Sequence, residues 1–267
     1  MRPSRSPSGD GAELARLGHW WGAVVLVLVA VSCADGTVTS SSGETSVAAP
    51  TVLVFHRTAG FRHDSIQAGI EAIESLGAEL GMEVTVSDDP SAFERAQMGA
   101  VTAVVFLNTT GDVLDAGMQA HFEAFIRDGG GFLGIHSAAD TEYDWAWYGD
   151  LVGARFSGHP AVQAATVRFS GGHPVGDALP ASATMTDEWY DFAAQPEEDV
   201  VVLAVVDEAT YEGGTMGEPH PIAWAHEHDG GRSVYLGFGH TVESFQDPLV
   251  LELVGDALTW ISGPATS

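Results

Sequence analysis

A short apolar run that ends in a histidine, within residues 129–140, most constrains the fold of this chain. The segment reads Gly-Gly-Gly-Phe-Leu-Gly-Ile-His-Ser-Ala-Ala-Asp. Phe132, Leu133 and Ile135 give it the length and composition of a buried parallel strand. Because the carboxyl ends of strands in an open α/β sheet face the ligand crevice, His136 is a candidate for chemistry. The alternative is a histidine that caps a strand end and is satisfied by backbone groups.

Alternating strand-like and helix-like segments surround this run. In the first half we expect strands at 52–55, 82–86 and 101–107, helices at 66–76 and 114–127, and a short helix near 93–98. This order, with its tight connections, predicts a doubly wound parallel sheet. The second half is less regular, with strands expected at 163–169, 200–206, 222–224 and 233–238 and a closing helix at 249–261.

The charge balance excludes several classes of function. The 267-residue chain has 37 acidic and 10 basic residues, for a net charge of −27, and all ten basic residues are arginines. Such a surface repels nucleic acid and anionic membrane faces and suits neutral or cationic ligands. A phosphate-binding loop of the GxxxxGK[ST] type is excluded because there is no lysine, and no GxGxxG follows the first expected strand.

The first 50 residues look like a leader and a tether. An apolar run at 21–32 has signal-peptide length, arginines precede it, and the sole cysteine, Cys33, follows small residues as in a bacterial lipobox. We therefore predict a lipoprotein signal peptide at 1–33 with acylation of Cys33, a Ser/Thr-rich tether at 34–50, and one domain at 51–263. This predicts an extracytoplasmic lipoprotein whose only membrane contact is its lipid anchor, at the cell surface or in the periplasm. An ordinary secretory signal with an incidental cysteine is the alternative.

Polar, titratable side chains follow several of the expected strands. Because parallel strands end at one edge of a sheet, these residues can meet there although they are distant in sequence: His56, His63, Asn108, His136, Asp140, His240 and Glu243. Imidazoles and carboxylates suit general acid/base catalysis or a divalent metal. There is no HExxH motif and no Cys-based zinc site, so a metal (zinc or similar) at His63, His136 and His240 is one alternative and metal-free acid/base chemistry the other.

Two further groups of residues have both a functional and a structural interpretation. Asp187 and Glu188 are adjacent, so on a strand they point to opposite faces and only one serves a site directly. Aromatic residues can stack on sugar rings or fill the core, and the candidates are Trp145, Trp147, Tyr148, Trp189 and Trp224. The segment 143–148 is aromatic and acidic enough to suggest a pocket wall. We interpret the remaining histidines His121, His220, His226 and His228 as surface or structural residues.

Taken together, several ordered motifs across 51–263 make the chain resemble the trehalose-utilisation (ThuA-like) family. They are Gly60-Phe61-Arg62-His63, Gly134-Ile135-His136-Ser137-Ala138-Ala139-Asp140, Trp145-x-x-Tyr148, Gly153 onward to Gly158-His159-Pro160, Asp187-Glu188-Trp189-Tyr190, Pro221-x-x-Trp224, Gly231-Arg232 and Gly239-His240. The resemblance implies a flavodoxin-like three-layer α/β/α sandwich with a mostly parallel sheet, similar to class I glutamine amidotransferases. His136 falls where those enzymes carry their nucleophilic cysteine, so glutamine hydrolysis is not expected.

The resemblance also implies a role in sugar or glycoside catabolism. We expect a hydrolase or lyase that acts on 3-keto-glycoside-like carbohydrates, with these catalytic candidates: His63, His136, Asp140, His159, Glu188 and His240. The expected substrate-binding residues are Arg62, Asn108, Trp145, Tyr148 and Trp224. Two alternatives stay open, a non-catalytic carbohydrate-binding lipoprotein and a structural domain with an inactive amidotransferase-like pocket.

Overall fold

The computed structural model describes residues 48–196 and 199–263. The predicted signal peptide, Cys33 and residues 34–47 of the predicted tether lie outside the described residues. Within the described ranges, none of the helices combines the length and apolar character needed to cross a bilayer.

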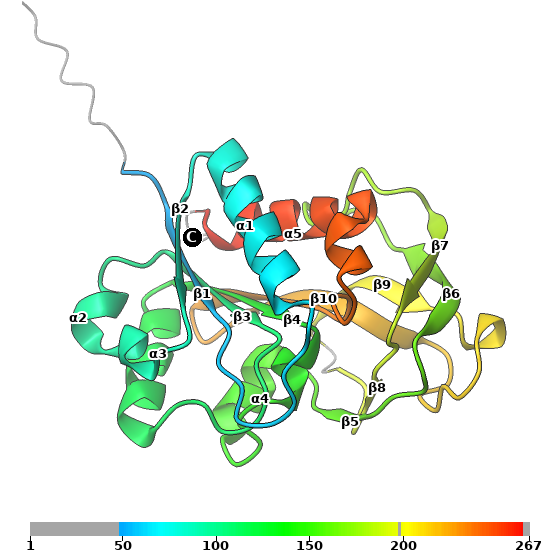
Figure 1. Ribbon diagram of the computed structural model, residues 1–267, viewed down its shortest axis with the longest axis horizontal. Coiled ribbons are helices and arrows are strands. Elements are labelled where there is room, and N and C mark those ends of the chain that lie inside the picture. Colours follow the sequence, from blue (N-terminus) through cyan, green and yellow to red (C-terminus); the bar gives the residue numbers. More distant parts are fainter. Residues whose placement is uncertain (1–47, 197–198, 264–267) are drawn as a thin grey trace, which may run out of the picture. The chain divides into compact units, whose positions relative to one another are not determined.

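A nine-stranded sheet forms the centre of the domain, in the order β2-β1-β3-β4-β11-β10-β9-β6-β7 (Figure 1). Its strands are β1 (Thr51–Phe55), β2 (Glu83–Ser87), β3 (Ala103–Leu107), β4 (Gly131–Ile135), β6 (Gln163–Phe169), β7 (Ser182–Asp187), β9 (Val201–Val206), β10 (His220–His228) and β11 (Gly231–Leu236). The neighbours β2, β1, β3, β4 and β11 pair in parallel, and β10, β9, β6 and β7 continue the sheet with antiparallel pairing. A separate two-stranded sheet pairs β5 (Phe156–Gly158) with β8 (Asp191–Phe192).

Helices cover both faces of this sheet. On one face lie α1 (Ile66–Leu80) and α5 (Pro248–Ile261), and on the other α2 (Arg95–Met98), α3 (Ala116–Arg127) and α4 (Ala146–Val152) (Figure 1). Short 3₁₀ turns complete the chain: η1 (Pro90–Phe93), η2 (His136–Asp140), η3 (Glu208–Thr210) and η4 (Glu243–Gln246). The sheet therefore has a hydrophobic core on each side, and its central strands are buried on both faces.

Local sequence explains where the main helices begin and end. In α1, the buried residues Ile66, Ile70 and Ile73 recur at helical spacing, and Gly81 ends the helix in the left-handed conformation with φ +70°. The carboxylate of Asp115 caps α3 by accepting hydrogen bonds from two backbone N–H groups, and that of Asp247 caps α5 by accepting one from the backbone N–H of Leu249.

The order of the strands places a crevice at the carboxyl ends of β1 and β3. The chain passes outward from β1 to β2 and then returns to the other side of β1 to form β3, and such a switch in direction is where open α/β sheets bind ligands. The connections after β1, β3, β4 and β11 all leave the sheet at this edge, so the residues that follow these strands can converge.

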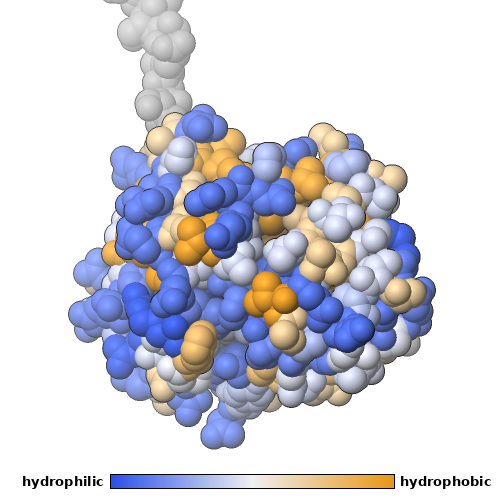
Figure 2. Space-filling model, turned by 45° about the vertical axis from the view of Figure 1, so that its right-hand side comes forward, coloured by the Kyte–Doolittle hydropathy of each residue, from blue (hydrophilic) through white to orange (hydrophobic). Residues whose placement is uncertain are grey.

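The structure confirms the predicted α/β class with a large central sheet, and it adds detail that the periodicity did not reveal. The half of the sheet beyond β11 is antiparallel, and its β10 extends over nine residues where only 222–224 was expected. The segment 143–148, predicted as a pocket wall, instead leads into the first turn of α4, and Trp145, Trp147 and Tyr148 pack against or within the core. The space-filling view shows a largely hydrophilic face with separate apolar patches (Figure 2), as the acidic composition leads one to expect.

Candidate functional site

Three histidines and one carboxylate meet at the carboxyl edge of the parallel strands. His63 lies in the loop after β1, His136 directly after β4, and His240 in the loop after β11. Glu188 follows β7, which reaches this edge from the far side of the sheet. One side-chain N or O atom from each of the four residues lies within 4.8 Å of the other three. The strand-end argument therefore predicted correctly that these histidines lie together.

Glu188 is the centre of this cluster. Its Oε2 lies 3.0 Å from Nδ1 of His240 and 3.5 Å from Nε2 of His136, and those two ring nitrogens are 3.3 Å apart. The rings of His63, His136 and His240 form a triangle with centroid separations of 4.8, 5.1 and 5.3 Å. Nitrogen lone pairs and a carboxylate are thus concentrated in one small volume.

Burial and mutual contact shift the pKa values within the cluster. Burial, together with the neighbouring imidazoles of His136 and His240, lowers the pKa of His63 to about 3. Burial alone would raise the pKa of Glu188, but hydrogen bonds from His136 and His240 outweigh it and lower that pKa to about 2. The hydrogen bond to Glu188 raises the pKa of His240 above its usual 6.5. At neutral pH the site therefore holds a neutral His63 beside an ionised Glu188.

The backbone of His136 is held in an unusual conformation. Its φ is +48°, in the left-handed region that non-glycine residues seldom adopt. The Tyr235 hydroxyl donates a 2.8 Å hydrogen bond to the His136 carbonyl, and Nδ1 of the ring lies 3.2 Å from the Gly237 carbonyl. The Tyr190 ring packs against the imidazole at a centroid distance of 4.2 Å. These contacts fix the ring with Nε2 directed at Glu188.

Asp187 positions the loop that carries His240. Its carboxylate accepts hydrogen bonds from the backbone N–H of Gly239 (2.8 Å), the backbone N–H of His240 (3.1 Å) and the hydroxyl of Ser244 (2.7 Å). Gly239 has φ +117°, a conformation that requires glycine. The pair Asp187 and Glu188 therefore divides as predicted, because Glu188 faces the cluster while Asp187 holds the neighbouring loop.

Asn108 also acts on this loop. The side chain is fully buried, and its amide donates to the Gly239 carbonyl (2.9 Å) and to the Ser65 hydroxyl (3.0 Å), which itself donates to the same carbonyl (2.8 Å). Asn108 was predicted to bind substrate, but its burial means that it orients the His240 loop from beneath.

His159 approaches the cluster from the loop after β5. Its Nδ1 lies 2.9 Å from Oε1 of Glu188, the oxygen that faces away from His240, and its side chain is 39% exposed. His159 contacts Glu188 and is more exposed to solvent than His240, whose side chain is 25% exposed, and this suits proton transfer better than permanent ligation.

Two of the three aromatic residues predicted to bind sugar, Trp224 and Tyr148, are core residues. Trp224 is fully buried, donates to the Val152 carbonyl and stacks on Tyr235 at 4.5 Å. Tyr148 is also fully buried, with its hydroxyl on the Ala138 carbonyl. Trp145 is half-buried, donates to Glu123 and lies against α3. The assignment of Trp224 and Tyr148 to the substrate is therefore corrected, because both rings are covered by other side chains. Trp145 borders a separate hollow of about 280 Å³ that contains none of the cluster residues.

Two other predicted site residues lie outside the cluster. The Asp140 carboxylate accepts a 2.8 Å hydrogen bond from the Tyr143 hydroxyl, and Arg62 is exposed, with its guanidinium 3.5 Å from the His56 carbonyl. Neither belongs to the set of converging ligand atoms. Arg62 nevertheless lies next to His63 in the same loop, so a contact between Arg62 and a ligand stays a prediction.

His220 is the centre of a second polar cluster, below Tyr190. Its Nε2 lies 2.8 Å from the Tyr190 carbonyl, and its Nδ1 lies 2.9 Å from Oε1 of Glu208 and 3.0 Å from the Tyr211 hydroxyl. The imidazole is buried, and these contacts join β10 to the loop around η3. This arrangement agrees with the structural interpretation of His220.

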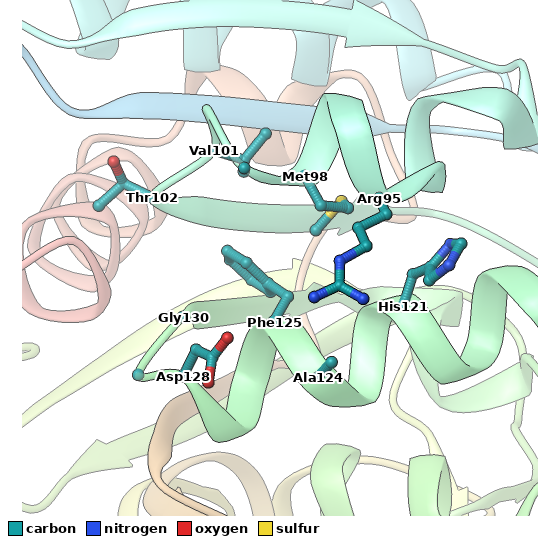
Figure 3. Close-up of a pocket in the computed structure, with 11 residues that line it drawn as sticks. Arg95, Met98, Val101, Thr102, His121, Ala124, Phe125, Asp128 and Gly130 are labelled. Carbon is teal, nitrogen blue, oxygen red and sulfur yellow. The ribbon is translucent and has the colours of Figure 1, made fainter.

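A hollow in the surface lies at the opposite edge of the sheet and contains no residue of the histidine cluster. It measures about 500 Å³ and lies between α2, α3 and the starts of β3 and β4. Figure 3 shows Arg95 and His121 pointing toward it, with Phe125 and Asp128 along one side. Because the carboxyl ends of the parallel strands lie on the other edge, this hollow contributes nothing to the site described above.

The fold and the position of the cluster define a flavodoxin-like α/β protein with a histidine and carboxylate site at the carboxyl edge of its sheet. The chain belongs to the ThuA family, described as trehalose utilisation, whose model matches residues 51–261. Membership in this family relates the protein to sugar utilisation. A comparison with curated proteins gave no match.

Solved structures agree with the fold. A protein described as ThuA-like from Bacteroides uniformis is 23% identical, with 80% of this chain and 93% of that chain covered and a TM-score of 0.69. A second protein so described, from Parabacteroides merdae, is 17% identical, with coverage of 82% and 92% and a TM-score of 0.67. A β-galactosidase from Rahnella contains a similar fold within 32% of its length, at 14% identity and a TM-score of 0.53. At these identities the likeness concerns the fold alone.

Proposed function

We propose that this protein is a carbohydrate-active hydrolase or lyase that acts on 3-keto-glycosides with the help of a divalent metal. The observation that carries this proposal is the convergence of three imidazoles on Glu188. Membership in a sugar-utilisation family supports a carbohydrate as the substrate, and the strongly acidic surface favours a neutral one.

The residues present fit a divalent cation. Both ring nitrogens of His136 face oxygen acceptors, Nδ1 toward the Gly237 carbonyl and Nε2 toward Glu188. A neutral imidazole has only one N–H, so the ring donates to both Gly237 and Glu188 only in its doubly protonated form. A divalent cation held by His136 and Glu188 would take the place of the second proton, and a backbone carbonyl on the other nitrogen is the usual partner of a ligating histidine. His63, His136, His240 and Glu188 would hold the ion, and this mixed nitrogen and oxygen set suits zinc or a similar metal.

A 3-keto group makes such chemistry accessible to a small set of residues. When bound, the metal would polarise the ketone oxygen. A base then removes the acidified proton at C2, the C1–C2 double bond forms as the C1–O glycosidic bond breaks, and the leaving oxygen takes up a proton. We assign the removal of the C2 proton to His159, because His159 contacts Glu188 and remains partly exposed to solvent.

Metal content tests this proposal directly. We expect purified protein to bind about one equivalent of a divalent metal, measured by inductively coupled plasma mass spectrometry after incubation with zinc, manganese or iron and desalting. His136→Ala should lose it, because the ring supplies a central ligand. His121→Ala is the matched control, since His121 bonds to the Phe93 carbonyl far from the cluster and should retain the metal. Absence of metal from the wild type would exclude the metal-dependent reaction and leave metal-free acid/base catalysis or sugar binding.

We also propose that the protein is a lipoprotein anchored through Cys33. Replacement by Cys33→Ser is expected to abolish incorporation of radiolabelled palmitate in cells and to move the protein from the membrane fraction to the soluble fraction. A Ser32→Ala variant is the control, because alanine is also a small residue before the cysteine. Unchanged labelling of the Cys33→Ser protein would rule out this anchor.

A further inference from the structure

A small cavity opens beside the histidine cluster and shares two residues with it. It measures about 230 Å³, and His63 and His240 form part of its wall. The rest comes from the loop after β1, from the residue before β6 and from the segment that leads into η4. Any molecule that occupies this cavity therefore touches the edge of the proposed catalytic site.

The rim of this cavity is unusually apolar for an acidic protein. Phe61 is 65% exposed, Val162 40% and Val242 38%, and all three line the cavity. They make up half of the six large hydrophobic residues that are exposed in the described part of the chain. Scattered exposed hydrophobic residues are ordinary, but three from separate segments around one cavity indicate a binding surface.

Phe61 is held in place although its ring is exposed. The backbone N–H of Ala59 donates to the Thr110 carbonyl at 2.7 Å, the N–H of Gly60 donates to the Thr110 hydroxyl at 3.1 Å, and this hydroxyl donates to the Phe61 carbonyl at 2.8 Å. The Phe61 ring meets the His63 ring edge to face at 4.8 Å. The backbone that carries Phe61 is thus fixed before a ligand binds, which reduces the conformational entropy lost on binding.

Polar groups complete the cavity. Asp64 and Glu243 also line it, and both residues are exposed to solvent. Carboxylates accept hydrogen bonds from hydroxyl groups and repel anions. An apolar face bordered by carboxylates is therefore complementary to a ring that has C–H groups on one face, hydroxyls at its edge and no negative charge.

We propose that this cavity is the subsite for a neutral pyranose ring of the glycoside, with Phe61 as its stacking platform. The inference rests on the proposed function and specifies which part of the surface recognises the sugar. The apolar C–H face of the ring lies on Phe61 between Val162 and Val242, and its hydroxyls point to Asp64 and Glu243. This arrangement places the far edge of the ring next to His63 and His240. It also explains why the buried Trp224 is not needed for recognition.

Binding of simple sugars to the full-length protein tests the subsite. The probes are trehalose, methyl α-D-glucopyranoside and methyl β-D-glucopyranoside, with glucuronic acid as the anionic counterpart, and binding is followed by saturation-transfer NMR and calorimetry. We expect at least one neutral probe to bind, glucuronic acid to bind at least tenfold more weakly, and Phe61→Ala to weaken binding of the neutral probe about tenfold or more. Phe61→Trp should restore binding, because it retains an aromatic face.

Leu80→Ala is the matched control, because Leu80 is another exposed hydrophobic residue at the end of α1, outside this cavity. Equal binding by the wild type and Phe61→Ala would overturn the proposal, as would failure of every neutral probe to bind. The same measurements on His136→Ala separate the subsite from the reaction. If that variant loses metal but binds the sugar in a Phe61-dependent way, the subsite stands, whatever the metal result says about catalysis.

Discussion

Glu188→Gln is expected to weaken metal binding by about 100-fold or more and to abolish turnover of a 3-keto-glucoside. The amide preserves the shape of the side chain but removes the negative charge on which the cluster converges. In the metal-free protein the same change should lower the pKa of His240, because the hydrogen bond that raises this pKa comes from Glu188. Competition with a chromophoric chelator measures the first effect, and NMR titration of the imidazole signals measures the second.

Glu142→Gln is the matched control for this experiment. Glu142 is also a buried carboxylate, but its oxygens accept hydrogen bonds from the backbone N–H groups of Val113 and Leu114 and from the Gln119 amide. Its substitution should lower the free energy of unfolding by about 1–3 kcal/mol and leave metal affinity and the pKa of His240 unchanged. If Glu188→Gln retained full metal affinity, Glu188 would not be a ligand. An unchanged His240 pKa would contradict the hydrogen bond seen in the structure.

The histidines of the site could be located from the sequence because they depend on a simple rule. His63 and His136 follow apolar runs that read as parallel strands, and neighbouring parallel strands end at one edge. His240 follows β11, which pairs with β4 in parallel and forms an antiparallel hairpin with β10 on its other side. The rule therefore locates the edge at which these residues meet, but it does not say which residue of each connection enters the cluster, because His56 directly follows β1 and is not part of it.

The antiparallel half could not be derived in the same way. Glu188 reaches the cluster only because β7 pairs with β6 at the far end of the sheet, and no periodic pattern in its sequence specifies that register. The function of Asp187 as an acceptor for two backbone N–H groups depends on tertiary contacts alone. The platform formed by Phe61 was equally hidden, since the loop contacts to Thr110 connect residues about fifty positions apart.

The misassignment of Trp224 has a specific physical cause. Seven consecutive residues of β10, from His220 to His226, are buried, so this strand does not alternate between polar and apolar faces. An aromatic residue within it looks the same in sequence whether it faces a ligand or the core. The contact with Gly153 shows that Trp224 faces the core, because a Cβ at position 153 would lie 2.5 Å from Nε1 of Trp224. The glycine and tryptophan motifs thus fit each other, and together they close the core beneath α4.

Trp224→Ala is accordingly expected to lower the free energy of unfolding by about 3–5 kcal/mol. The substitution leaves a large cavity, removes the stack on Tyr235 and the edge contact with Phe192, and leaves the Val152 carbonyl without its 2.9 Å hydrogen bond. Urea unfolding followed by circular dichroism measures the loss. Trp224→Phe should cost less, because it keeps an aromatic ring in the stack and loses mainly the hydrogen bond.

Trp145→Ala provides the matched comparison for a tryptophan that is only half-buried. It donates to Glu123 and stacks on Trp147 near the surface, so its removal should cost about 1 kcal/mol. Sugar binding by each variant that remains folded should equal that of the wild type, because neither ring borders the cavity at Phe61. If Trp224→Phe instead weakened sugar binding tenfold while stability was preserved, the tryptophan would have to face a ligand in solution. The burial of Trp224 within β10 would then not describe the protein in solution.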